Sequence, residues 1–248
     1  MTLDTNPFLT DVQTLHDTVP FHLIRTEHFE PALRKGMEMH REEIDRIIQN
    51  PAPPDFANTI VALEKSGALL NRVSTVFGNL LSAETSDEME AIAEKMMPQL
   101  TEHSNNITLN EDLFLRIKAV YENTDREQLG QEDRMLLQNT YDGFIRSGAN
   151  LTPEQKERFR EVSSELSVLT WRFSQNKLKE TNAFELELAD DQLDGLPESA
   201  LQAYAQTAQE KGKEGHVVTL HAPSFLPFMK YSRHRELRKQ LYLAYNTL

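Results

Sequence analysis

The sequence predicts a mainly α-helical protein with one small β element, and three observations lead to this fold class. Glycine and proline number only 9 and 11 among 248 residues, too few for the many turns of a β-rich fold. Apolar residues recur at steps of three and four over most of the chain. Alternation with period two is confined to residues 184–188 and 216–220. We expect these two stretches to pair as an antiparallel ribbon packed on helices, because an isolated ribbon is marginally stable.

The first helix follows an extended lead-in over residues 1–25, which contains Pro7 and Pro20. Thr26 is the expected N-cap, and Pro51 ends the helix after about residue 50. Its apolar stripe consists of Phe29, Leu33, Met37, His40, Ile44 and Ile47.

Four more helices are predicted before residue 150. One begins after Asp55, with a buried stripe of Ile60, Leu63, Leu70, Val73, Phe77 and Leu80. The next begins near Ser86, and Pro98 should kink or divide it. Two further amphipathic segments cover about 110–122 and 126–147.

A long helix follows a capping box in which Thr152 is the N-cap and Gln155 the third helical residue. We expect it to reach about residue 182. Its apolar residues alternate steps of three and four, which is typical of a seam that packs against neighbouring helices. They are Phe159, Val162, Leu166, Leu169 and Phe173. Shorter helices are predicted over about 198–211 and 232–245.

The charge balance excludes several classes of partner. Lys and Arg number 26 against 39 Asp and Glu, which gives a net charge of −13. Such a chain is a poor ligand for nucleic acid or an anionic membrane surface. The absence of cysteine excludes disulfides, cysteine–zinc sites and a thiol nucleophile. We expect a cytoplasmic protein, or a periplasmic one if a signal peptide has been removed.

No motif assigns a metal or phosphate site. The segment from His40 to Glu43 approaches the zinc motif H-x-x-E-H, but Ile44 stands where the second histidine belongs. His216 and His221 are expected on opposite faces of a strand end. The segment from Gly143 to Gly148 lacks the Lys and Ser or Thr of a phosphate loop.

Two charged segments allow a functional and a plainer interpretation. Asp190 and Asp191, with Asp194 nearby, could form a glycosidase-like acid/base pair, but a solvated acidic loop is favoured. The basic residues of 230–239 could meet an acidic surface, whereas a solvated helix face is the commoner meaning. We therefore assign no catalytic, cofactor-binding or metal-binding residue within 1–248.

Four ordered stretches carry a family resemblance. They are Asn6-Pro-Phe-Leu9 with Val19-Pro-Phe21, Glu27-His-Phe-Glu-Pro-Ala32 and Gly36-Met37; Pro54-Asp-Phe-Ala-Asn-Thr-Ile-Val-Ala-Leu-Glu-Lys-Ser-Gly-Ala-Leu-Leu70 with Arg72-Val-Ser-Thr-Val-Phe77; Gly195-Leu-Pro-Glu198 with the helix after it; and Pro223-Ser-Phe-Leu-Pro-Phe-Met229 with Tyr231, Arg235-Glu-Leu-Arg238 and Tyr242-Leu-Ala-Tyr245. Together they resemble the N-terminal part of the thimet-oligopeptidase-like zinc metallopeptidases, and within them the bacterial peptidyl-dipeptidases.

The resemblance implies the helical lobe of a clamshell-type peptidase, with 1–248 as a single helical region that forms one wall of a channel. In that family a zinc ion is held by H-E-x-x-H and a further glutamate, in a C-terminal catalytic lobe. This sequence lacks the motif, so the resemblance places the zinc outside it and predicts that the chain alone is inactive.

Two functional hypotheses follow. The first is the N-terminal region of a zinc-dependent peptidyl-dipeptidase or oligopeptidase that hydrolyses short peptides and releases C-terminal dipeptides. Its partners would be short peptides and the catalytic lobe of the same protein. The alternative is a free-standing helical interaction module without enzymatic activity.

Overall fold

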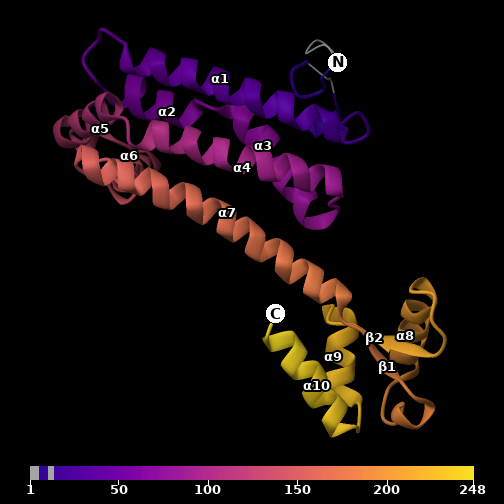
Figure 1. The fold of residues 1–248 in the computed structure, drawn as a ribbon. Coiled ribbons are helices and arrows are strands. Elements are labelled where there is room, and N and C mark those ends of the chain that lie inside the picture. The colour runs from indigo at the N-terminus through magenta and orange to yellow at the C-terminus, as the bar shows by residue number, and fades with distance from the viewer. Residues whose placement is uncertain (1–5, 11–13) are drawn as a thin grey trace. The chain divides into compact units, whose positions relative to one another are not determined.

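The computed structural model describes residues 6–10 and 14–248, and these are mainly helical with a small antiparallel sheet, so the predicted fold class is confirmed. The chain divides into two compact units, residues 1–168 and 169–248. The boundary falls within one long helix, α7 (Pro153–Ala183), which Figure 1 shows as a continuous coil. Each unit is described by itself.

The first unit is built from α-helices joined by short turns. Its described α-helices are α1 (Phe29–Ile48), α2 (Ala62–Lys65), α3 (Ala68–Ala83), α4 (Asp87–Thr108), α5 (Glu111–Asn123), α6 (Gln131–Arg146) and the first half of α7. Turns of 3-10 helix cover Leu15–Asp17, Thr26–His28 and Arg126–Gln128, and a π-helical turn covers Phe56–Val61. The described part of residues 1–25 contains turns and no α-helix.

Helix α1 is the centre of this unit, and it packs most extensively on α3 and then on α4 and α5. In Figure 1 it lies beside α3 and α4. Phe29 on α1 contacts Phe77 on α3, with ring centroids 5.1 Å apart. At Gly36 a Cβ atom would lie only 2.9 Å from the Cα of Leu70. The two backbones can therefore approach closely because residue 36 has no side chain.

A second cluster of buried side chains lies farther along α1. It joins α1 to the π-helical turn, α5 and α6, and its most deeply buried members are Ile60, Leu113, Ile117, Val120 and Leu137. The apolar stripe predicted for α1 is thus its buried face, as the helical period requires.

The structure differs from the prediction at two places: the start of α1 and the middle of the helix predicted after Asp55. Thr26 does not cap α1: it begins a 3-10 turn, and the ring of His28 accepts the backbone N–H of Arg25. The helix predicted after Asp55 is broken, because Gly67 has a left-handed φ of 70° between α2 and α3. Glycine is the residue that adopts this conformation without steric strain.

The other helices of the first unit follow the prediction more closely. Ser86 caps α4 by accepting the N–H of Met89 at 3.3 Å, and Pro98 does not divide this helix. Thr152 and Gln155 form the predicted capping box at the start of α7, with reciprocal bonds of 3.3 and 3.0 Å.

The second unit combines the remainder of α7 with a ribbon and three shorter helices. They are β1 (Leu186–Leu188), α8 (Glu198–Glu210), β2 (His216–Val218), α9 (Ala222–Tyr231) and α10 (Arg235–Asn246), and a 3-10 turn covers Asp190–Gln192. The strands pair antiparallel, with Leu186 opposite Val218 and Leu188 opposite His216, as predicted. Leu188, Val218, Tyr204 and Phe228 belong to the buried core of this unit.

Helix α9 was not predicted, because its sequence contains Pro223 and Pro227. Pro223 lies in the first turn, where a missing backbone N–H has no cost. Pro227 follows only one turn later, so it removes a single helical hydrogen bond at most.

The seam predicted on α7 is the clearest departure. Val162 and Leu166 in the first unit are 44% and 60% exposed, and Leu169 and Phe173 in the second unit are 51% and 65% exposed, whereas Phe159 is half-buried. Among the described residues, none of the helices combines the length and apolar character that crossing a bilayer requires.

Candidate functional site

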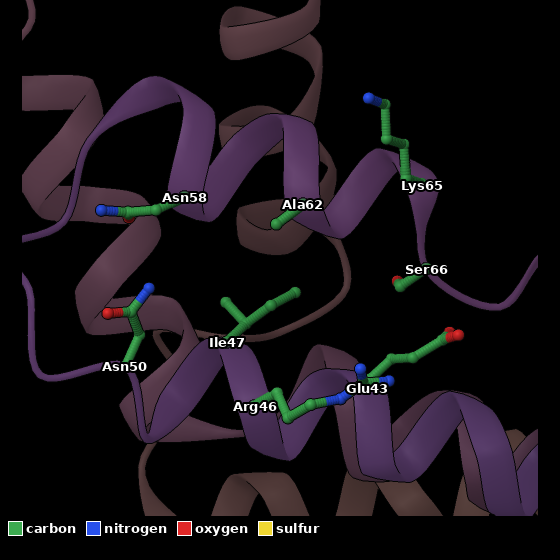
Figure 2. A pocket seen from close by; sticks show the side chains of 8 residues that line it. All are labelled: Glu43, Arg46, Ile47, Asn50, Asn58, Ala62, Lys65 and Ser66. Atoms are coloured by element: carbon green, nitrogen blue, oxygen red, sulfur yellow. The ribbon is translucent and has the colours of Figure 1, made fainter.

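A polar groove lies between the C-terminal half of α1 and the segment that contains the π-helical turn and α2 (Figure 2). Its volume is ≈ 350 Å³. Asn50 and Asn58 face each other at one end, and Glu43 and Ser66 lie at the other. Arg46 and Lys65 also line it. In this groove, polar side chains from separate segments of the first unit converge.

The end with the two asparagines is held by local capping. Asp55 accepts the N–H of Asn58 at 2.7 Å, and the amide oxygen of Asn58 accepts the N–H of Asp55 at 3.1 Å. Arg116 from α5 donates to the same amide oxygen at 3.2 Å and to the carbonyl of Asn50 at 3.0 Å. These bonds use the polar groups to fix the loop, so this end is structural.

The opposite end contains the break between α2 and α3. A carboxylate oxygen of Glu43 accepts the N–H of Gly67 at 2.7 Å. The hydroxyl of Ser66 donates to the carbonyl of Leu63 at 2.7 Å. A Cβ atom at Gly67 would lie 2.9 Å from the ring of His40. Glycine at this position therefore satisfies both the backbone conformation and the contact with the histidine.

A chain of hydrogen bonds connects this end to α4. Nε2 of His40 lies 3.2 Å from Oγ of Ser66, and Nδ1 of His40 lies 3.1 Å from Nε2 of His103. Because Ser66 gives its only proton to Leu63, its oxygen accepts the Nε2–H of His40. Nδ1 of His40 then accepts the Nε2–H of His103. Both histidines are neutral in this arrangement. The hydrogen bonds run in one direction, from His103 to His40, from His40 to Ser66 and from Ser66 to the carbonyl of Leu63.

Burial explains why these two histidines stay neutral. It is the main cause that lowers the pKa of His103 to about 4, and the positive charge of Arg41, with the charge that His40 would carry if it were protonated, acts in the same direction. Burial also lowers the pKa of His40, while the carboxylate of Glu43 opposes this. Protonating His103 would place a charge in a site where it is only 6% exposed, which desolvation disfavours.

The arrangement does not form a serine nucleophile. An activated serine gives its proton to a neighbouring base, whereas Ser66 gives it to a backbone carbonyl. Within the described ranges, no three side chains of His, Cys, Asp or Glu gather in a way that could hold a metal ion. The groove and the histidine pair can thus bind by hydrogen bonds and position helices.

The residues weighed from the sequence do not come together in the structure. His216 lies in β2 and His221 precedes α9. Asp190 and Asp191 lie exposed in a 3-10 turn. Gly143 lies within α6, so the following segment is not a phosphate loop.

The charged segments of the second unit are partly paired. Arg233 donates to a carboxylate oxygen of Asp194 at 3.3 Å. Arg238 donates to the carbonyl of Ser232, so these two basic side chains help to hold the turn before α10.

The histidine pair could not be found by spacing. His40 and His103 are 63 residues apart, and the sequence around each histidine contains no signal that the two are in contact. The available signal was that His40 occupies a position in the apolar stripe of α1, which indicates a packed histidine that needs a partner.

Comparisons with known proteins bear on the whole chain. No protein-family model matches it. It is 34% identical to the dipeptidyl carboxypeptidase of Escherichia coli over 241 residues, which are 96% of this chain and 35% of that protein. It is 31% identical to oligopeptidase A of the same organism over 244 residues, 98% of this chain and 35% of that protein. A thimet-like oligopeptidase of Dictyostelium discoideum is 24% identical over 222 residues, 88% of this chain and 32% of that protein.

The chain therefore spans about a third of the length of the curated relatives it matches. The alignments include nearly all of its residues, which confirms the resemblance inferred from the four ordered stretches. Over almost its full length, the chain is a homologue of dipeptidyl carboxypeptidase and oligopeptidase A, and a more distant one of a thimet-like oligopeptidase.

Proposed function

We propose that residues 1–248 form the N-terminal helical region of a zinc-dependent peptidyl-dipeptidase or oligopeptidase that hydrolyses short peptides. The observation that carries this proposal is homology over 96% and 98% of the chain to a dipeptidyl carboxypeptidase and an oligopeptidase A. The proposed reaction is the release of C-terminal dipeptides. A cytoplasmic location belongs to the same proposal, and fractionation of the source cells tests it.

The role of this region in the proposal is to shape a channel wall rather than to carry out the chemistry. The described residues do not fit zinc, because they offer no group of three suitable donors. Ser66, the serine that lies beside a histidine in the groove, directs its proton to a carbonyl. We therefore place the zinc and the groups that activate water in a C-terminal lobe outside this sequence, and assign no reaction step to residues 1–248.

The test compares two proteins with the same short peptides. One is the complete product of the source gene, and the other is the chain of residues 1–248. We expect the complete product to shorten peptides from the C-terminus by two residues per cut, as measured by mass spectrometry. A chelator should remove this activity and zinc should restore it. The 248-residue chain should be inactive and should bind no stoichiometric zinc by calorimetry.

Two results would contradict the proposal. One is hydrolysis by the 248-residue chain itself together with a tight zinc site. The other is a reading frame that stops directly after Leu248. The second result would favour the alternative of a free-standing helical interaction module, which the exposed apolar face of α7 also supports.

A further inference from the structure

Residues 6–10 form a turn whose key side chains are buried in the first unit. The turn contains no helix or strand, yet Asn6 is only 4% exposed and Phe8 only 3%. The ring of Phe8 packs on Phe29 at the start of α1, with ring centroids 5.3 Å apart. Phe29 in turn contacts Phe77 of α3. A segment outside the helices therefore supplies an aromatic side chain to the core that α1 and α3 share.

Hydrogen bonds to the helices fix the orientation of this turn. The side-chain amide of Asn6 donates to the carbonyl of His28, directly before α1, at 2.8 Å. The guanidinium of Arg72 on α3 donates to the carbonyl of Phe8 at 2.9 Å, and a bond from a charged donor is stronger than one between neutral groups. An apolar anchor with a few well-placed polar contacts is typical of a binding site, so the turn is held as a ligand would be.

The sequence of the turn favours this shape before it docks. The N–H of Leu9 donates to the carbonyl of Asn6 at 2.9 Å, which closes a four-residue turn. The N–H of Phe8 donates to the side-chain oxygen of Asn6 at 3.0 Å. Asparagine is favoured at the first position of such a turn and proline at the second, where Pro7 stands. A peptide with this sequence therefore loses little conformational freedom when it binds.

We propose that the start of α1 and the side of α3 form a peptide-binding site, which residues 6–9 fill within the same chain and which accepts a free peptide of sequence Asn-Pro-Phe-Leu. Its ligand class is a short uncharged peptide in which an asparagine and a proline precede an aromatic residue. Because the turn belongs to no helix or sheet, it can open while α1 stays folded. The inference requires no catalytic lobe and does not rest on the proposed function.

The test uses the 248-residue chain and a synthetic peptide with the sequence of residues 6–10, blocked at both ends. Phe8→Ala removes the ring of the turn and leaves its place for the ring of the free peptide. Phe21→Ala is the matched control, because Phe21 is 57% exposed. A second peptide carries alanine in place of phenylalanine. Calorimetry measures the binding of each peptide, and circular dichroism measures whether each variant is folded.

We expect the Phe8→Ala chain to bind one phenylalanine peptide per molecule. It should bind at least about tenfold more tightly than the unchanged chain or Phe21→Ala, because in those two proteins the intact turn competes at a high effective concentration. The alanine peptide should show no binding. A folded Phe8→Ala chain that binds neither peptide, or that binds both equally, would overturn the inference.

A second measurement keeps the inference testable if Phe8→Ala does not fold. Arg72→Ala removes the bond to the carbonyl of Phe8 at an exposed position, and Arg134→Ala, exposed on α6, is its control. Hydrogen exchange at residues 8 and 9, followed by NMR, should become about tenfold faster in Arg72→Ala. It should stay unchanged in Arg134→Ala. Equal exchange in the two variants would contradict the contact on which the site depends.

The same measurement tests whether a free peptide can replace the turn. In the unchanged chain, an excess of the phenylalanine peptide should speed exchange at residues 8 and 9 and leave the amide of Leu33 in α1 unaffected. If the turn exchanges only as fast as Leu33, it opens only when the unit unfolds and the inference is wrong. None of these readouts depends on peptide hydrolysis, so their failure would leave the proposed function standing.

Discussion

Helices α1 and α7 have similar apolar patterns and opposite surroundings. On α1, Phe29 is 1% exposed and Leu33 0%, because α3, α4 and α5 cover the stripe. On α7, Leu166 is 60% exposed and Phe173 65%. Helical spacing therefore predicts which face of a helix is apolar. It does not predict whether the sequence at hand contains the element that covers that face.

The largest expected difference between the two helices is in stability. Leu33→Ala in α1 removes buried side-chain volume and should lower the free energy of unfolding by about 2–5 kcal/mol. Leu166→Ala in α7 is the matched control, with an expected change within about 0.5 kcal/mol. Urea unfolding of the 248-residue chain, followed by circular dichroism, measures both. A similar loss in the two variants would mean that the α7 face is covered within this chain.

The second prediction concerns the histidines that join α1 to α4. The pKa of His103 is about 4 in the folded chain against an ordinary value of about 6.5. The unfolded chain therefore binds more protons between these values, and stability is lost as the pH falls from about 6.5 to 4. The loss from this group approaches about 3 kcal/mol at the acid end. Urea unfolding midpoints across this pH range measure it.

A glutamine at position 103 can still donate a hydrogen bond to His40 but does not titrate. His103→Gln should therefore flatten the dependence of stability on pH between 6.5 and 4. His22→Gln, at an exposed position, should leave the dependence unchanged. If His103→Gln keeps the full slope, other groups cause it.

The third prediction compares two glycines, one with a left-handed backbone conformation and one inside a helix. Gly67 has a φ of 70° and faces the ring of His40, so Gly67→Ala should cost about 1–2 kcal/mol. Gly78 lies inside α3, and a Cβ there would meet nothing within 4 Å. Gly78→Ala should therefore stabilise the chain by about 0.5–1 kcal/mol. Thermal unfolding of both variants tests this difference in sign, and stabilisation by both would contradict the role given to Gly67.

The smallest expected effect is at the start of α7. Thr152 caps the helix through the N–H of Gln155, and Thr152→Ala should cost about 1 kcal/mol. Thr152→Ser keeps the hydroxyl and should restore most of the stability. Hydrogen exchange of the first turn of α7 provides a local measurement. Equal exchange in both variants would show that Pro153 and the rest of the helix hold this end without the cap.

The sequence predicted the structure correctly where that structure depends on residues that are neighbours along the chain. The capping box at Thr152, the helical period of α1 and the alternation at residues 184–188 all express local geometry, and all three are present. The break at Gly67 was missed because a glycine inside an apolar pattern predicts either a weakened helix or a turn. The contact of His40 with His103 joins residues 63 positions apart, so only the packing of α1 on α4 reveals it.

The close approach of α1 to α3 and to the segment before it depends on Gly36. Its missing side chain lets α1 approach Leu70 on α3, where a Cβ would lie 2.9 Å from a backbone atom. His40 follows one turn later on the same side of α1, and its bond to Ser66 has a length of 3.2 Å. Adding one methyl group at position 36 would push the two helices apart and lengthen that bond. The hydrogen bond between His40 on α1 and Ser66 before α3 thus depends on a hydrogen atom at position 36.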